Sequence, residues 1–179
     1  MFTVADSLVY LVIWNNSKVE SSIGVSGFGM EWFPLLFAGT AVVFLTFAAP
    51  VGRLADRVGR ARVWLAGHAF LLVVYLLLWT GSTSTPVVFG ILALLGLFYA
   101  STDGVLPALA SGVIPAERRS GGLAILATAI ALAKMLSAMG FGLIWHRYGA
   151  DRAVLIAATG LMVTVCLVIF MSRTDSTFK

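Results

Sequence analysis

Charged residues are scarce in this sequence. Only 11% of its 179 residues are Asp, Glu, Lys or Arg, whereas 60% are hydrophobic, and the mean hydropathy is +0.99. Soluble domains are roughly half apolar and a quarter charged, so a soluble fold could not bury this much apolar surface. The 12 basic residues are spread between apolar segments, which argues against nucleic acid as a partner. The composition therefore predicts an integral membrane protein whose surroundings are the lipid bilayer.

Residues that build disulfides, metal sites and nucleotide sites are also nearly absent. The single cysteine, Cys166, excludes a disulfide within the chain. His68 and His146 lie near the ends of different apolar segments and share no metal-ligand spacing with an acid or a cysteine, so we expect no metal. The chain has no G-x-x-x-x-G-K-[ST] loop, which leaves an ATP-driven mechanism without support.

An enzyme would need a nucleophile and a base, or metal ligands, at one depth in the membrane. Gly24-Val25-Ser26-Gly27 is similar to the G-x-S-G of intramembrane serine proteases, but it lies in a polar loop and neither histidine is in the middle of an apolar segment. We therefore expect no enzymatic activity and no cofactor.

Five apolar segments approach the roughly 20 residues that cross about 30 Å of hydrocarbon. A sixth stretch, residues 1–14, is too short to cross and contains Asp6, so we interpret it as part of a truncated first helix. The tryptophans lie within a residue or two of the segment ends, as expected at a membrane interface. The five predicted spans are residues 33–50, 63–80, 86–107, 123–145 and 153–171.

If the segments alternate across the membrane, the basic residues divide unequally between its two sides. One side has Arg53, Arg57, Arg60, Arg62, Arg118, Arg119, Arg173 and Lys179, and the other has Lys18, Arg147 and Arg152. Cytoplasmic loops carry the excess of Lys and Arg. We therefore predict a multi-pass protein of the inner or plasma membrane, with its C-terminus in the cytoplasm and the polar loop 15–31 outside.

The chain also repeats weakly at an offset of 90 residues. The offset pairs three helices with three later ones, and an odd number of helices per repeat inverts the second copy. Such nested inverted repeats are typical of transporters. The matching pairs are Gly52 with Gly142, Arg57 with Arg147, Gly59 with Gly149, Arg62 with Arg152, Leu65 with Leu155 and Leu71 with Leu161.

The strongest local pattern is the loop Gly52-Arg53-Leu54-Ala55-Asp56-Arg57-Val58-Gly59-Arg60-Ala61-Arg62. Gly52 would let two helices approach closely, and Gly59 would permit a tight turn. Asp56 could accept hydrogen bonds from a neighbouring helix N-terminus, while Arg57 and Arg60 hold the cytoplasmic face. We interpret these five residues as a conformational switch; the alternative is an ordinary positively charged cytoplasmic loop.

The loop resembles the signature G-x-L-A-D-R-x-G-R-[RK] of the major facilitator superfamily, which follows the second helix of either six-helix half. Asp6-Ser7-Leu8, Phe33-Pro34-Leu35-Leu36 and the short tail after the last segment favour the C-terminal half. The sequence departs from the pattern at Ala61, where a second basic residue is usual. It departs again at Gly112, three residues before Pro115, where the family often has an acid.

The resemblance implies an all-α integral membrane fold over residues 1–179, a six-helix half bundle built as a 3+3 inverted repeat. It implies secondary transport of a small solute, for example by proton-coupled efflux. The substrate would lie between this half and a partner, either a missing N-terminal six-helix half or a second copy of the chain. The alternative is an inactive fragment or scaffold in the membrane without transport activity.

Three charged residues fall inside the apolar segments: Asp6, Asp103 and Lys134. A charge near the centre of a membrane helix costs about 2.5–3.5 kcal/mol on insertion scales, so it usually faces a cavity or a partner. We therefore expect these residues to bind substrate or carry a proton. The alternative is that Asp103 and Lys134 neutralise each other and have a structural role.

Overall fold

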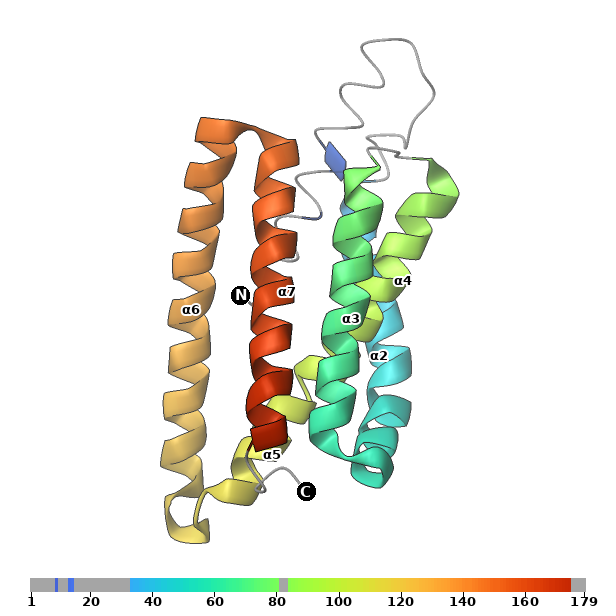
Figure 1. The fold of residues 1–179 in the computed structure, drawn as a ribbon. Coiled ribbons are helices and arrows are strands. Elements are labelled where there is room, and N and C mark those ends of the chain that lie inside the picture. The colour runs from blue at the N-terminus through green and yellow to red at the C-terminus, as the bar shows by residue number, and fades with distance from the viewer. Residues whose placement is uncertain (1–8, 10–12, 15–32, 81–83, 175–179) are drawn as a thin grey trace, which may run out of the picture.

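The computed structural model of the chain describes residues 9, 13–14, 33–80 and 84–174, and this part is helical with short connections and no strand. Five helices in it are long and apolar enough to cross a membrane. They run alternately up and down in the bundle of Figure 1. In chain order the elements are α2 (Phe33–Val58), α3 (Arg60–Trp79), α4 (Thr85–Thr102), α5 (Val105–Val113), the 3₁₀ helix η2 (Ala116–Arg118), α6 (Arg119–Tyr148) and α7 (Ala150–Thr174).

The predicted first helix, residues 1–14, lies mostly outside the described residues, as do Asp6 and the polar loop 15–31. Of this segment the structure describes three helical positions. Two of them, Val9 and Ile13, are buried and belong to the main hydrophobic core.

The helices are longer than the apolar segments predicted from the sequence. α2 continues through Pro50, the predicted end of its span, to Val58. α6 begins four residues before its predicted segment and ends three residues after it, at Tyr148. The added turns carry polar and charged residues, such as Arg53, Asp56 and Arg57 of α2, which lower the hydropathy and so fall outside the predicted spans. Hydropathy therefore located the membrane-crossing part of each helix and not its ends.

The predicted span 86–107 differs from the structure, which has two helices here. α4 ends at Thr102 and α5 begins at Val105, with Asp103 and Gly104 between them. Pro107 explains the break, because proline cannot donate a hydrogen bond to the carbonyl four residues earlier, that of Asp103, and its ring crowds that carbonyl.

Two one-residue junctions join long antiparallel helices. Gly59 links α2 to α3 with a φ of 108°, and Gly149 links α6 to α7 with a φ of 82°. Each glycine N–H donates to the carbonyl four residues before it, Ala55 at 3.0 Å and Trp145 at 2.9 Å. These positive φ angles favour glycine. The junctions are 90 residues apart and lie at opposite ends of the bundle (Figure 1), as an inverted repeat requires.

The core is centred on α4, which packs against both α2 and α3. Leu95 and Phe98 of α4 and Val74 of α3 are fully buried there. Glycines set the closest approaches: a Cβ on Gly96 would lie 2.6 Å from the Val43 side chain of α2, and a Cβ on Gly67 would lie 2.8 Å from Ser101 Cβ of α4.

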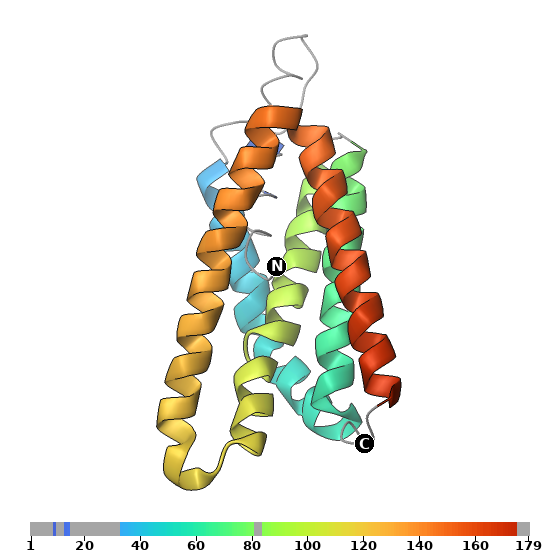
Figure 2. The ribbon, with the colours of Figure 1, turned by 60° about the vertical axis from the view of Figure 1, so that its left-hand side comes forward.

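α6 lies at the edge of the described bundle, where it contacts α7, α5 and η2. Phe141 is its one buried residue in this part of the chain. Figure 2 shows α6 and α7 meeting at their junction and diverging toward their other ends. Most of the α6 surface is therefore left for lipid, for another part of the protein or for a partner.

Candidate functional site

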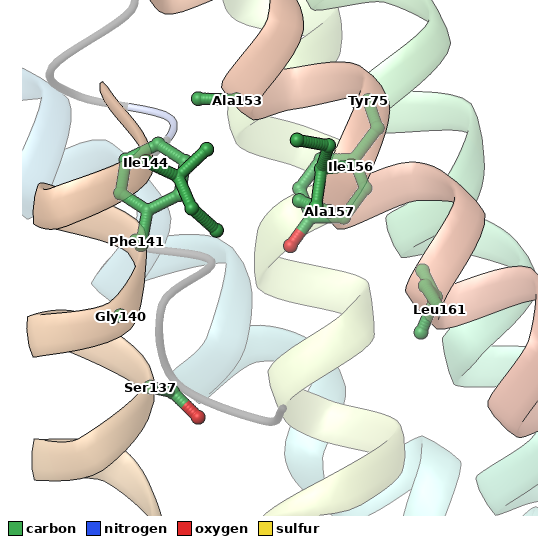
Figure 3. A pocket seen from close by; sticks show the side chains of 9 residues that line it. All are labelled: Tyr75, Ser137, Gly140, Phe141, Ile144, Ala153, Ile156, Ala157 and Leu161. Atoms are coloured by element: carbon green, nitrogen blue, oxygen red, sulfur yellow. The ribbon is translucent and has the colours of Figure 1, made fainter. Parts of the chain in front are cut away.

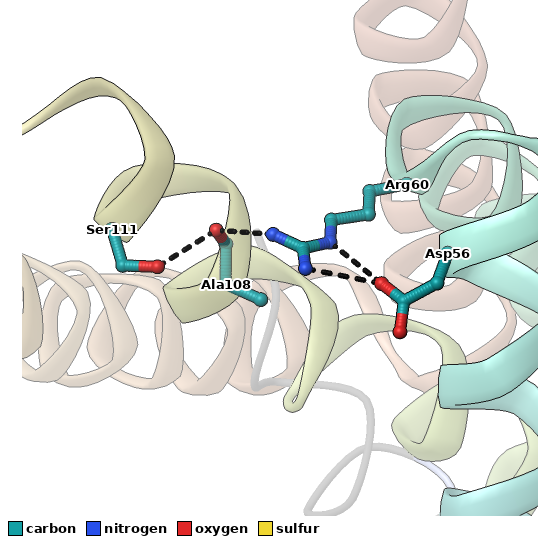
Figure 4. Close-up of polar contacts among 4 residues, drawn as sticks. All are labelled: Asp56, Arg60, Ala108 and Ser111. Atoms are coloured by element: carbon teal, nitrogen blue, oxygen red, sulfur yellow. Dashed lines mark hydrogen bonds and ion pairs between the residues drawn. The ribbon is translucent and has the colours of Figure 1, made fainter.

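The predicted switch loop is a helical junction held by one arginine. The Arg60 guanidinium contacts Asp56 Oδ1 twice, through Nη2 at 3.0 Å and through Nε at 3.1 Å. The pair spans the Gly59 turn, so it joins the last turn of α2 to the first turn of α3. Figure 4 shows both contacts converging on a single carboxylate oxygen.

Arg60 also connects this junction to α5, 48 residues away in sequence. Its Nη1 donates to the Ala108 carbonyl oxygen at 2.8 Å, and the Ser111 hydroxyl donates to the same oxygen at 2.9 Å. A backbone carbonyl oxygen has two lone pairs, so the Ala108 oxygen can accept hydrogen bonds from more than one donor. We call Asp56, Arg60, Ala108 and Ser111 the junction network (Figure 4).

The junction network is exposed, and its ion pair is therefore weak. The Arg60 and Asp56 side chains are 40% and 63% exposed, and exposed pairs of this kind contribute only about 0–1 kcal/mol. A contact of this strength can form in one conformation and break in another at little cost. It restrains α2, α3 and α5 relative to one another without contributing much to folding.

The other switch residues differ from the sequence-based expectations. Asp56 contacts Arg60 and, among the described residues, no helix N-terminus. A Cβ on Gly52 would meet nothing within 4 Å, so the close helix approach predicted at Gly52 is wrong. Gly52 instead lines a cavity of about 190 Å³ beside the junction network, together with Asp56 and Arg60. Arg57 is exposed on the last turn of α2.

Lys134 lies in the middle of α6 and is exposed. Residues three, four and seven positions apart share a face of a helix, so Lys134 lies on the same face as Ile130, Ser137 and the buried Phe141. This is the face of α6 that turns toward the rest of the bundle. Within the described part of the chain, Lys134 has no hydrogen bond and no ion pair.

Asp103 occupies the break between α4 and α5, where its N–H donates to the Tyr99 carbonyl at 2.9 Å. It is exposed and lies at a helix end, whereas the sequence analysis placed it well inside a span. The structure does not pair Asp103 with Lys134, so the predicted mutual neutralisation is not found between these described residues. Asp6 lies outside the described residues.

The burial of His68 was not predicted from the sequence. His68 is 3% exposed, and its Nδ1 lies 2.7 Å from the Trp64 carbonyl oxygen. Its ring lies 4.2 Å from the Trp64 ring and meets Phe98 edge-on at 5.7 Å, measured between centroids. The spacing of Arg60, Trp64 and His68, four residues apart, was a readable signal that all three share one face of α3.

The polar residues do not gather into a metal site in the described part of the chain, where no group of three or more His, Cys, Asp or Glu could hold an ion. The site is therefore a set of helix junctions and single charged side chains. It comprises the turn at Gly59, the contacts of Arg60, the helix break at Asp103 and the exposed Lys134 on α6.

Comparison with known proteins gives one informative result. No curated protein and no solved structure matched the chain. The family model of the Major Facilitator Superfamily matches residues 1–178, almost the whole chain. Since five helices of its described part are long and apolar enough to cross a membrane and the family model covers almost its whole length, the chain is a multi-pass membrane protein that belongs to the Major Facilitator Superfamily of transporters.

Proposed function

We propose that this chain forms one wall of a secondary transporter that moves a small solute across the plasma membrane. The solute would bind at the middle of the membrane, between this half bundle and a second six-helix half. That second half is either an N-terminal half of the same transporter or a second copy of the chain. Transport by a superfamily member of this kind uses a solute or proton gradient rather than ATP.

The observation that carries the proposal is the exposed Lys134 in the middle of α6. A lysine facing lipid at this depth would cost about 2.5–3.5 kcal/mol. Lys134 has no ionic partner among the described residues, and it shares the inward face of α6 with Phe141. A water-filled route, a substrate or the second half must therefore compensate its charge. A cation in this place favours a substrate with a carboxylate or another acceptor group.

The junction network supplies a restraint that can open during the transport cycle. Arg60 ties α2 and α3 to α5 through the Asp56 carboxylate and the Ala108 carbonyl. Rocking of one half against the other requires such restraints to break and re-form. Gly59, with its φ of 108°, would be the pivot between α2 and α3.

Asp103 is the candidate proton carrier among the described residues. It lies at the α4–α5 break and is exposed, and broken helices commonly mark the binding regions of transporters. Asp6 stays a second candidate on sequence grounds alone.

The orientation follows from the distribution of basic residues. The α2–α3 junction, the start of α6 and the end of α7 lie together at one end of the bundle in Figure 1. These segments, with η2 just before α6, contain Arg53, Arg57, Arg60, Arg62, Arg118, Arg119 and Arg173. The opposite end, at the α6–α7 junction, contains Arg147 and Arg152. We therefore assign the arginine-rich end, and with it the C-terminal side of α7, to the cytoplasm.

Transport by the full chain in liposomes tests the proposal. Currents or pH changes would be recorded after concentration jumps of acetate, a dicarboxylate, glucose and a quaternary amine, with and without a proton gradient. We expect transport of at least one acidic solute, reduced at least about tenfold by Lys134→Ala, because a hydrogen bond to a charged group contributes about 1.5–3 kcal/mol.

Leu132→Ala is the matched control, because Leu132 is 52% exposed on the opposite face of α6. We expect it to transport like the wild type. A folded chain that transports none of these solutes, alone or with a second half, would support the scaffold alternative. If Lys134→Ala and Leu132→Ala lower the transport rate equally, Lys134 does not lie on the solute route.

A further inference from the structure

A second cavity, of about 210 Å³, lies between α3, α6 and α7, away from the junction network. Its apolar walls include Phe141 and Ile144 of α6 and Ile156 and Leu161 of α7. It is larger than the roughly 150 Å³ cavity that takes up one benzene molecule in another protein. The space therefore suits one ring or a short stretch of hydrocarbon.

Two polar side chains line this otherwise apolar cavity, Ser137 of α6 and Tyr75 of α3, and Tyr75 is the buried one. Its side chain is 3% exposed and lines the cavity. Figure 3 shows the ring passing behind α7, with the hydroxyl oxygen on the side that faces α6. Within the described part of the chain the Tyr75 hydroxyl has no hydrogen bond. Leaving such a donor unsatisfied in an apolar site costs about 1–3 kcal/mol, so a ligand that accepts from it gains affinity.

The depth of the cavity indicates which acceptors can reach it. Tyr75 lies four residues before the end of α3 at Trp79, and Ala153 lies three residues after the start of α7 at Ala150, which is about 4–6 Å along the axis. α7 has 25 residues and is about 37 Å long, so its ends extend a few Å beyond about 30 Å of hydrocarbon. We infer that Tyr75, about 6 Å from the end of α3, lies near the boundary of the hydrocarbon. Ester carbonyls of lipids and of membrane-dissolved compounds are found at this depth.

We propose that the cavity between α3, α6 and α7 binds a small uncharged apolar group bearing an ester or ketone carbonyl, which accepts a hydrogen bond from Tyr75. The carbonyl lies at Tyr75, and the hydrocarbon part lies against Phe141, Ile156 and Leu161. Gly140 of α6 and Ala157 of α7 also line the cavity, and their small size leaves space for the ligand. Phe141 of the lining lies two turns from Lys134 on the same face of α6, but binding of this apolar group does not depend on transport.

A photoreactive methyl benzoate with a diazirine on its ring would test the site. The full chain in nanodiscs would be titrated with the probe, irradiated and mapped by mass spectrometry. We expect saturable labelling of peptides from α6 and α7. Tyr75→Phe should weaken apparent affinity about fivefold, the loss of one neutral hydrogen bond, and Ala157→Phe should abolish saturable labelling by filling the cavity.

Matched controls lie outside the cavity lining. Tyr148→Phe makes the same change at an exposed tyrosine on the last turn of α6, and Ala138→Phe makes the same change at an exposed alanine of α6. Both should label like the wild type. Labelling that does not saturate, or cavity variants that label like their controls, would overturn the proposal.

The lipid used in the nanodiscs distinguishes the natural source of the carbonyl. Ester-linked phosphatidylcholine has carbonyls that compete with the probe, whereas its ether-linked analogue has none. If the probe binds more strongly in the ether lipid, and Tyr75→Phe removes this difference between the lipids, the natural occupant is the lipid ester. Equal saturable binding in both lipids, still sensitive to Tyr75→Phe, would identify a free membrane-dissolved compound. Either result supports the site.

Discussion

The contact between α2 and α4 at Gly96 allows a quantitative test of the packing. An alanine Cβ at this position would lie 2.6 Å from both Cβ and Cγ1 of Val43 and 3.1 Å from the Thr40 carbonyl oxygen. Val43 Cβ is fixed to the backbone, so no change of rotamer moves it away. Gly96→Ala must therefore push α2 and α4 apart, which in a packed core costs about 1–3 kcal/mol.

Gly96→Ala also has a stabilising effect, because alanine has a higher helix propensity than glycine. A control substitution, Gly90→Ala, separates this effect from the clash. Alanine stabilises a helix interior by up to about 1 kcal/mol relative to glycine. Gly90 lies in the same helix, and a Cβ there would meet nothing within 4 Å. Gly90→Ala thus keeps the propensity gain without the clash. We expect Gly96→Ala to be less stable than Gly90→Ala by about 1–3 kcal/mol.

Denaturant unfolding of the full chain in detergent micelles, followed by tryptophan fluorescence, would give these stabilities. Val43→Gly removes the clashing side chain. In that background the cost of Gly96→Ala should fall by at least about 1 kcal/mol, as coupling between contacting residues predicts. Equal stability of the Gly90→Ala and Gly96→Ala proteins, or an unchanged cost after Val43→Gly, would refute the reasoning.

Two further predictions concern the α2–α3 junction. Gly59→Ala should lower stability by about 1–3 kcal/mol, because alanine is strained at a φ of 108°. Gly52→Ala should instead raise stability by up to about 1 kcal/mol, since it lies inside α2, where a Cβ meets nothing within 4 Å. The same unfolding assay compares them, and equal effects would contradict the junction geometry. Arg60→Ala should change stability by less than about 1 kcal/mol, because its ion pair with Asp56 is exposed. The substitution should nevertheless change the transport rate measured in liposomes. A large loss of stability with an unchanged transport rate would show that the junction network serves folding.

The sequence predicted the membrane spans because burial in lipid requires long apolar runs, which composition records directly. It also predicted the equivalence of Gly59 and Gly149, because a one-residue turn with positive φ needs glycine in both repeats. The break before α5 was readable from Pro107, but the continuous hydropathy of residues 86–107 hid it.

Contacts between distant segments could not be predicted in the same way. Arg60 binds a backbone carbonyl of α5, and any residue at position 108 would offer that oxygen. Gly52, Gly67 and Gly96 look alike in sequence, yet packing makes the last two into close helix contacts and leaves the first beside a cavity. The position of α4 between α2 and α3 decides which glycines lie at a close contact between helices.

The most direct test of the solute route is the water accessibility of position 134. In a Cys166→Ser background, Lys134→Cys and Leu132→Cys would be treated with a charged, membrane-impermeant methanethiosulfonate in intact liposomes. Thiols react as thiolates, which form in water and not in hydrocarbon. The account predicts modification at position 134 and none at position 132, on the opposite face of α6. Equal protection of both positions would show that Lys134 does not face a water-filled route and would contradict the proposed function.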